Sequence, residues 1–234
     1  MEKNVPRQSA NRILLKLPPK QLALLKPHLS AVDLAVRTKL ECRNTRIENI
    51  YFMEHGIASV VACGPGGRTI EVGIIGREGM TGLAVLLGDD RSPHDTFMQV
   101  AGDGQRMSAD KLRHAMDRSG ALRATLLRCA HAFHIQTTRT NLANGRTKIE
   151  QRLARWLLMA DDRIDDDELP LTHEFLSMML GVGRAGVTVA MRSLEGSGFI
   201  TTKRGLITVI DRQGLIESSD GIYIAPEGGQ RMVC

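Results

Sequence analysis

The chain has 234 residues, of which 42% are hydrophobic and 24% charged, and its formal net charge at pH 7 is +5. This composition excludes a wholly disordered chain and a low-complexity fibre, and the length is sufficient for two domains. Aromatic residues make up only 3% of the chain. So few rings argue against a surface that stacks single-stranded bases.

The four cysteines lie far apart, at Cys42, Cys63, Cys129 and Cys234. This spacing indicates neither a disulfide framework nor a zinc knuckle. The first ten residues contain no apolar signal core, and no run of about 18 apolar residues follows. We therefore expect a reduced, cytoplasmic protein that has no membrane partner.

Charge is distributed unevenly along the chain. Residues 106–160 carry a net charge of +8, whereas residues 161–168 carry −5. We interpret this change of sign as a domain junction. A solvated helix face followed by a loop would give the same pattern.

The first half of the chain changes from helical to β-rich patterning. From Arg7 to about Thr38, apolar spacing interrupted by prolines predicts short helices. Between residues 40 and 105, short runs of β-forming residues are separated by glycine and proline turns. That spacing is typical of a small antiparallel barrel or sandwich. A helix follows, with Ser108 as its N-cap and its end near Arg118.

A long helix is expected over residues 119–144, and a further one over residues 149–160. In the long helix, apolar or small residues follow one another at spacings that alternate between four and three residues, over three heptads. We predict that this face is the seam of a homodimer. Two of the positions are polar, so the alternative is that the same face packs on the β-rich module of its own chain. The seam positions are Leu122, Leu126, Cys129, Phe133, Gln136 and Thr140.

Residues 171–200 carry the most specific pattern in the sequence. Thr172 is placed to cap a short helix, and Gly181 supplies the left-handed residue that ends it. After a short turn, a second helix begins with one apolar face. Two short strands follow around a turn at residues 203–205. The face of the second helix opposite its apolar side consists of Arg184, Ala185, Thr188, Val189 and Arg192.

A helix, a tight turn, a second helix and a hairpin are suited to bind DNA. The second helix begins with Arg184 and small side chains, so its N-terminal end fits a major groove about 12 Å wide. Arg192, Lys203, Arg204 and the region of Thr172 are expected to contact phosphates. The alternative is a helical pair without nucleic acid, because such pairs occur in many folds.

The order of these parts resembles the Crp/Fnr family of bacterial transcription regulators over nearly the whole chain. The resemblance implies an α+β fold with an N-terminal antiparallel β-roll like that of cyclic-nucleotide-binding domains, a long dimerisation helix and a C-terminal winged helix-turn-helix. It places a sensor domain at 1–118, the dimerisation helix at 119–144 and the DNA-binding domain at 145–234. The specific matches to the family motif are Thr172, Gly181, Arg184, Val187 and Leu194.

The resemblance also implies the partners of the chain. A homodimer would bind a near-palindromic site in double-stranded DNA, with RNA polymerase as a further partner of an activator. Arg184 would make a bidentate contact to a guanine. Ala185 and Val189 stand where many members have charged base readers, so we expect a different operator sequence.

The sensor half departs from the cyclic-nucleotide-binding members of the family. Those members carry Gly-Glu-Leu and, further along, Arg-Ser/Thr-Ala. Here Leu83 replaces the glutamate that holds the ribose hydroxyl, and Pro93 lacks a backbone donor. We therefore expect that the chain binds no cyclic nucleotide. The arginine of the cassette, Arg91, would instead form an ion pair with a nearby aspartate. By the resemblance, the candidate effector pocket consists of Gly82, Leu83, Arg91, Ser92, Thr137 and Thr138.

No other cofactor and no enzymatic activity is evident. An iron–sulfur cluster needs clustered thiolates, and no histidine stands out as a haem ligand. His131 and His134 do not by themselves complete a metal site. The segment at residues 64–69, GPGGRT, lacks the ending of a phosphate loop and is better read as a hairpin turn. The sequence leaves open a small-molecule-binding module whose helical tail contacts proteins rather than DNA, and it assigns no role to residues 218–234.

Overall fold

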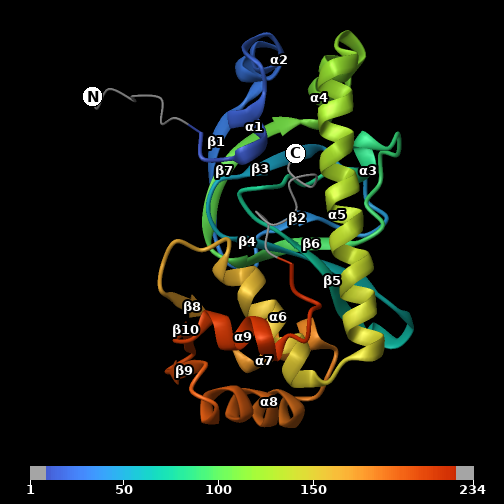
Figure 1. Cartoon of the computed structure of the whole chain (residues 1–234). Coiled ribbons are helices and arrows are strands. Elements are labelled where there is room, and N and C mark those ends of the chain that lie inside the picture. Colours follow the sequence, from blue (N-terminus) through green and yellow to red (C-terminus); the bar gives the residue numbers. More distant parts are fainter. Residues whose placement is uncertain (1–8, 225–234) are drawn as a thin grey trace.

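The computed structural model describes residues 9–224. A β-roll lies at one end, a long helix runs beside it, and a helical unit with a small sheet lies at the other end (Figure 1). The helices are α1 (Arg12–Lys16), α2 (Pro19–Leu25), α3 (Leu83–Leu86), α4 (Ala109–Arg118), α5 (Gly120–Arg146), α6 (Ile149–Asp161), α7 (His173–Leu180), α8 (Arg184–Gly196) and α9 (Arg212–Ser218). The strands are β1 (Ser30–Leu34), β2 (Lys39–Glu41), β3 (Asn49–Met53), β4 (Ile57–Cys63), β5 (Thr69–Ile75), β6 (Asp95–Val100), β7 (Gly102–Ser108), β8 (Glu168–Pro170), β9 (Ile200–Lys203) and β10 (Leu206–Val209).

The β-roll consists of two antiparallel sheets, with strand orders β1-β7-β3 and β2-β6-β4-β5. Buried apolar side chains from both sheets, such as Leu34, Met53 and Met98, form one core cluster. This confirms the β-rich module, and residues 64–68 connect β4 and β5 as a hairpin. The prediction of helix up to Thr38 is wrong, because β1 pairs with β7 along its whole length. A short strand of this kind is stabilised by a partner that is distant in sequence.

The long helix α5 buries its heptad face against its own chain. Leu122 and Leu126 are fully buried and pack in one core with α4 and β3. Further along, the amide of Gln136 bonds both backbone groups of Ile74, accepting from its N–H at 2.7 Å and donating to its carbonyl at 3.1 Å. The predicted dimer seam is therefore wrong as assigned, and the alternative of packing on the β-roll is correct. A heptad repeat reports that one stripe is buried but does not identify its partner. The reassigned seam residues are Leu122, Leu126, Cys129, Phe133 and Gln136, whereas the half-buried Thr140 accepts a hydrogen bond from Arg155 on α6 at 3.3 Å.

The helices α6 to α9 share a second large core with the strands β8 to β10. The acidic segment 161–168 lies inside this unit, because α6 precedes it and packs against α7 and α8. Two ion pairs join the segment to the β-roll, Arg163 with Glu78 and Asp165 with Arg77, at 2.7 and 2.6 Å. The interpretation of this segment as a domain junction is therefore wrong.

A buried carboxyl group joins the β-roll to the helical unit. Glu71 on β5 is 4% exposed and accepts a hydrogen bond from Trp156 Nε1 on α6 at 2.7 Å. Ser59 donates a second hydrogen bond to the other carboxyl oxygen. Burial raises the pKa of Glu71 to about 7, against the opposing effect of these two hydrogen bonds.

The raised pKa predicts a pH dependence of stability. The folded state binds the Glu71 proton more tightly than the unfolded chain, so the free energy of unfolding falls as pH rises between 4.5 and about 7. Glu71→Gln keeps a side chain of the same shape that can still form hydrogen bonds, but it does not titrate. It should therefore remove the pH-dependent part of the free energy of unfolding that Glu71 contributes, which is at most about 3 kcal/mol. Thermal unfolding between about pH 5 and pH 8 measures it. The exposed Glu48→Gln is the control, and identical pH profiles for wild type and Glu71→Gln would contradict the assignment.

Candidate nucleic-acid interface

The helices α7 and α8 form a helix-turn-helix. The hydroxyl of Thr172 caps α7 by accepting from the Phe175 N–H at 3.3 Å. Gly181 ends the helix with φ 61° and ψ 35°, a conformation that favours glycine. The chain bends by 101° between the two helices. Within residues 9–224, no single helix is long and apolar enough to span a membrane. The helices α7 and α8 meet the required length and hydropathy only when they are counted together across this bend.

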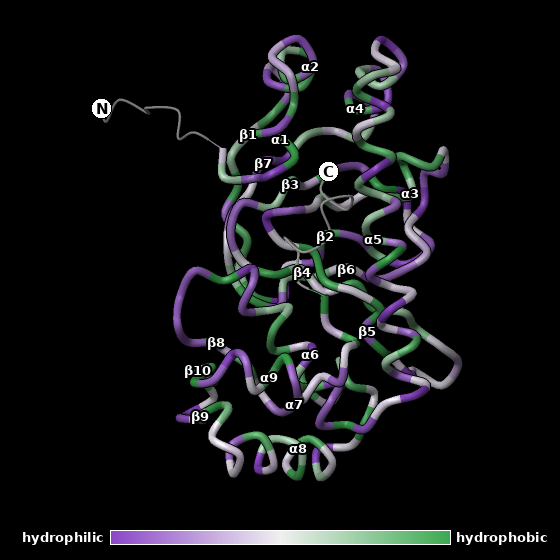
Figure 2. The backbone as a smooth tube through the Cα atoms, in the orientation of Figure 1, coloured by the Kyte–Doolittle hydropathy of each residue, from purple (hydrophilic) through white to green (hydrophobic). Residues whose placement is uncertain are grey.

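One face of α8 is buried and the other is open. Val187, Ala190, Met191 and Leu194 pack in the core of the helical unit. Hydrophobic and hydrophilic residues alternate along α8 (Figure 2). The helix lies at the end of the molecule farthest from the β-roll (Figure 1). The predicted DNA-facing residues Arg184, Ala185, Val189 and Arg192 are all exposed, Val189 by 61%.

Two predicted contact residues have hydroxyl groups that serve the fold. Thr188 is half-buried and donates its hydroxyl to the Arg184 carbonyl at 3.0 Å. The Thr172 side chain is exposed, but its oxygen caps α7. Neither hydroxyl is therefore a free base reader, and a role in DNA binding would fall to their backbone or methyl groups.

The wing is a hairpin of β9 and β10 with a two-residue turn. Arg204 and Gly205 both have positive φ, 51° and 82°, which is the type I′ geometry that suits such hairpins. A third strand, β8, pairs with β10 and was missed by the sequence analysis, because three residues are too few to show a β pattern. Glu195 at the end of α8 accepts from the Thr202 N–H and hydroxyl, at 3.0 and 2.9 Å, and so fixes the wing to the helix.

Four exposed cations lie on α8 and at the turn of the wing. The side chains of Arg184, Arg192, Lys203 and Arg204 have no hydrogen-bond or ion-pair partner among residues 9–224. The two wing residues lie at the β9–β10 turn, at the same end of the molecule as α8 (Figure 1). Binding to a polyanion requires unpaired, solvated cations of this kind at one end of a fold.

The candidate effector pocket is only partly assembled. Gly82 and Ser92 do come together, because both bind the side chain of Glu41 on β2. The Gly82 N–H donates to one oxygen at 2.5 Å and the Ser92 hydroxyl to the other at 2.7 Å. A carboxylate of the chain itself therefore occupies these two donors. No sequence pattern links Glu41 to these residues, so only the structure reveals this contact.

The other four predicted pocket residues point elsewhere. Arg91 is exposed, donates to the Asn44 carbonyl at 2.7 Å and lies 3.9 Å from Asp90, one of its expected partners. The hydroxyls of Thr137 and Thr138 both bond the His134 carbonyl within α5. Leu83 lines a separate cavity between α5 and α6.

Comparison with known proteins gives one match to a family model and several similar solved structures. Residues 151–218 match the Crp-like helix-turn-helix domain. No match was found among curated proteins. FixK2 from Bradyrhizobium japonicum is similar with a TM-score of 0.71 and 15% identity, over 84% of this chain and 98% of that one. A Crp/Fnr-family transcriptional regulator from Thermus thermophilus has a TM-score of 0.67 and 18% identity, over 82% and 98% of the two chains. The c-di-GMP-responsive global regulator CLP from Xanthomonas campestris has a TM-score of 0.67 and 13% identity, over 82% and 99%.

These findings define a β-roll protein with a winged helix-turn-helix. The chain has the fold of the Crp/Fnr transcription regulators, and its C-terminal part is a Crp-like helix-turn-helix DNA-binding domain. The resemblance drawn from the sequence is confirmed for the fold and for this domain.

The turn glycine gives a test of the interface geometry. A Cβ at Gly181 would lie 2.9 Å from Ile70 Cδ1, in a left-handed conformation that costs about 1–2 kcal/mol for other residues. Gly181→Ala should therefore lower the free energy of unfolding by at least that amount and weaken DNA binding. The control is Gly196→Ala on α8, where nothing lies within 4 Å. Denaturant unfolding compares them, and equal stabilities would show that the turn tolerates a side chain.

Proposed function

We propose that the chain is a sequence-specific transcription regulator that binds a near-palindromic site in double-stranded DNA as a homodimer. The observation that carries the proposal is the open face of α8 with Arg184 and Arg192, together with the two cations at the wing, all four unpaired within residues 9–224. In an operator complex the N-terminal end of α8 would enter the major groove. The two half-sites would lie about 34 Å apart, one helical turn of DNA.

Within each half-site the cations divide by position. Arg184 begins α8 and is placed to read a guanine through its two parallel N–H groups. Arg192, further along the same helix, and Lys203 and Arg204 at the wing would bind phosphates on either side of the groove. The small or apolar Ala185 and Val189 would contact thymine methyl groups. If the regulator activates transcription, RNA polymerase is its further partner.

The homodimer needs a different face of α5 from the one the heptad indicated. Ala124, His131, Thr138 and Gly145 are exposed and follow one another at intervals of seven residues. Leu127 and Leu142 stand beside this line and are 37% and 55% exposed. Exposed leucines on a helix that runs the length of the β-roll favour a second copy of α5 as their partner.

The β-roll is proposed to act without a cyclic nucleotide. The carboxylate of Glu41 holds the Gly82 N–H and the Ser92 hydroxyl. A cyclic nucleotide would have to displace this anion and would find Leu83 where a ribose acceptor is needed.

Arg184→Ala tests base reading. The substitution should weaken operator binding by about 1–3 kcal/mol and relax the preference at one base pair, because a bidentate contact is lost. Binding to a selected operator and to its single-base variants, at about 0.15 M salt, measures both effects. Arg118→Ala, an exposed arginine at the end of α4, is the matched control. Equal operator affinity in wild type and Arg184→Ala would remove Arg184 from this role.

Leu142→Asp tests the dimer face. Its side chain is 55% exposed in the single chain, so the fold should survive while a charge prevents close contact between two α5 helices. Light scattering should report a monomer, and operator affinity should fall at least about tenfold because one half-site alone is bound. Leu87→Asp makes the same change at a leucine that is 70% exposed outside α5, and it should remain dimeric. A dimeric Leu142→Asp protein would place the interface elsewhere.

Cyclic AMP tests the β-roll. A ligand present at about 100 times its dissociation constant stabilises the fold it binds by about 2.7 kcal/mol. With cyclic AMP in the millimolar range, we expect no saturable shift of the unfolding temperature in the wild type, because Glu41 occupies the anion position. A saturable shift would show that the carboxylate yields to the nucleotide.

A further inference from the structure

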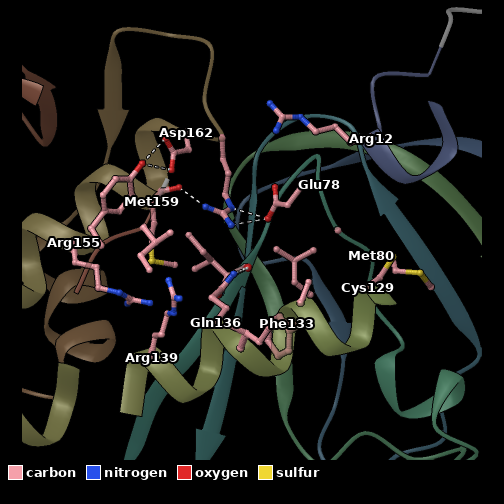
Figure 3. A pocket seen from close by; sticks show the side chains of 18 of the residues that line it. Arg12, Glu78, Met80, Cys129, Phe133, Gln136, Arg139, Arg155, Met159 and Asp162 are labelled. Carbon is pink, nitrogen blue, oxygen red and sulfur yellow. Dashed lines mark hydrogen bonds and ion pairs between the residues drawn. The ribbon is translucent and has the colours of Figure 1, made fainter. Parts of the chain in front are cut away.

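A cavity of about 140 Å³ lies where α5, α6 and β5 meet. Figure 3 shows side chains from α5 and α6 converging on it. Apolar groups form one part of its wall, among them Ile74, Phe133 and Met159. Glu41 and Ser92 of the β-roll cassette do not line it. Of the residues that the sequence assigned to an effector pocket, only Leu83 lines this cavity.

The acidic residues of the cavity wall already have partners. Glu78 is paired with Arg163, with 2.7 Å between carboxylate oxygen and guanidinium nitrogen. Asp162 is paired with Arg212 at 2.5 Å and accepts from the Tyr223 hydroxyl at 2.9 Å. Neither carboxylate therefore neutralises the remaining arginines of the wall.

Two of those arginines face each other across the cavity. Arg139 on α5 and Arg155 on α6 point their guanidinium groups toward one another (Figure 3). Arg155 is only 6% exposed, and its one hydrogen bond goes to the Thr140 hydroxyl at 3.3 Å. Arg139 has no hydrogen-bond or ion-pair partner within residues 9–224.

This arrangement is electrostatically unfavourable as it stands. Burial is the main reason that the pKa of Arg155 falls to about 10, and the positive charges of Arg163 and Arg139 contribute to the fall. The negative charge of Glu71 opposes that fall, but its carboxyl group is bonded to Ser59 and Trp156. A buried cation normally has an anion bound to it, and here the described chain provides none within ion-pair distance.

We propose that this cavity binds a small organic carboxylate, held between Arg139 and Arg155, with its apolar body against Phe133 and Met159. The planar guanidinium fork matches the two oxygens of a carboxylate. The volume is close to that of a cavity of about 150 Å³ that holds benzene, so the body has roughly the size of one six-membered ring.

The position of the site gives it a regulatory consequence. Arg139 belongs to the helix that packs on the β-roll, and Arg155 belongs to the helix that packs against α7 and α8. A bound anion would tie α5 to α6 and thus favour one orientation of the helix-turn-helix relative to the β-roll. This consequence rests on the proposed function, whereas binding of the anion does not.

The test uses the full chain without DNA and benzoate as the probe. Benzoate is added up to about 20 mM at constant ionic strength, with neutral benzamide as its analogue of equal shape. Two signals are followed, the unfolding temperature and the fluorescence of Trp156, the single tryptophan of the chain and the neighbour of Arg155. The variants are Arg139→Gln and Arg155→Gln. Arg128→Gln, an exposed arginine on the same helix, is the matched control.

We expect a saturable rise of the unfolding temperature with benzoate but not with benzamide. Half-saturation should require at least about tenfold more benzoate in Arg139→Gln, which is the loss expected for a charge-assisted contact. Arg128→Gln should behave like the wild type. Arg139 is partly exposed, so this variant decides the outcome even if Arg155→Gln fails to fold.

Two results would overturn the site: no benzoate-dependent change in either signal in the wild type, or an unchanged titration in Arg139→Gln. Operator binding with and without saturating benzoate then tests the regulatory consequence. Unchanged operator affinity would overturn that consequence alone. A protein that selects no operator would remove the proposed function, while the benzoate titration would still decide the anion site.

Discussion

Trp156 donates its indole N–H to the buried carboxyl of Glu71, and this contact joins the two halves of the molecule. A buried carboxyl must keep its hydrogen bonds, because leaving one unsatisfied costs about 1–3 kcal/mol or more. The contact therefore fixes where α6 lies on β5. Since α6 forms one core with α7 and α8, it also fixes the direction in which the open face of α8 points.

The same helix carries the two features through which a signal would reach the DNA-binding domain. Arg155 and Trp156 are consecutive residues of α6, one lining the proposed anion site and the other bonded to Glu71. By the proposal, a change of charge at either place would act on the packing of α6 against the β-roll. In a two-state regulator, such a contact biases the equilibrium between arrangements of the DNA-binding domains.

In the β-roll, a carboxylate of the chain itself binds two of the residues that the sequence assigned to an effector pocket. The carboxylate of Glu41 satisfies the Gly82 N–H and the Ser92 hydroxyl, so these donors do not remain buried and unpaired. Two arginines without an ion-pair partner among the described residues, Arg139 and Arg155, face each other at the junction of α5 and α6.

Several features of the fold follow from local chemistry and can be recognised in the sequence. Gly181 specified the turn between α7 and α8, and Arg204-Gly205 the turn of the wing, because few residues adopt a positive φ without strain. The amphipathic period of α8 likewise identified its open face. Long-range contacts, in contrast, set what the buried stripe of α5 packs against, the pairing of residues 30–34 as a strand, and the bond between Glu41 and Gly82. Periodicity and propensity report that a residue is buried or extended, whereas its partner is set by chain segments far away in the sequence.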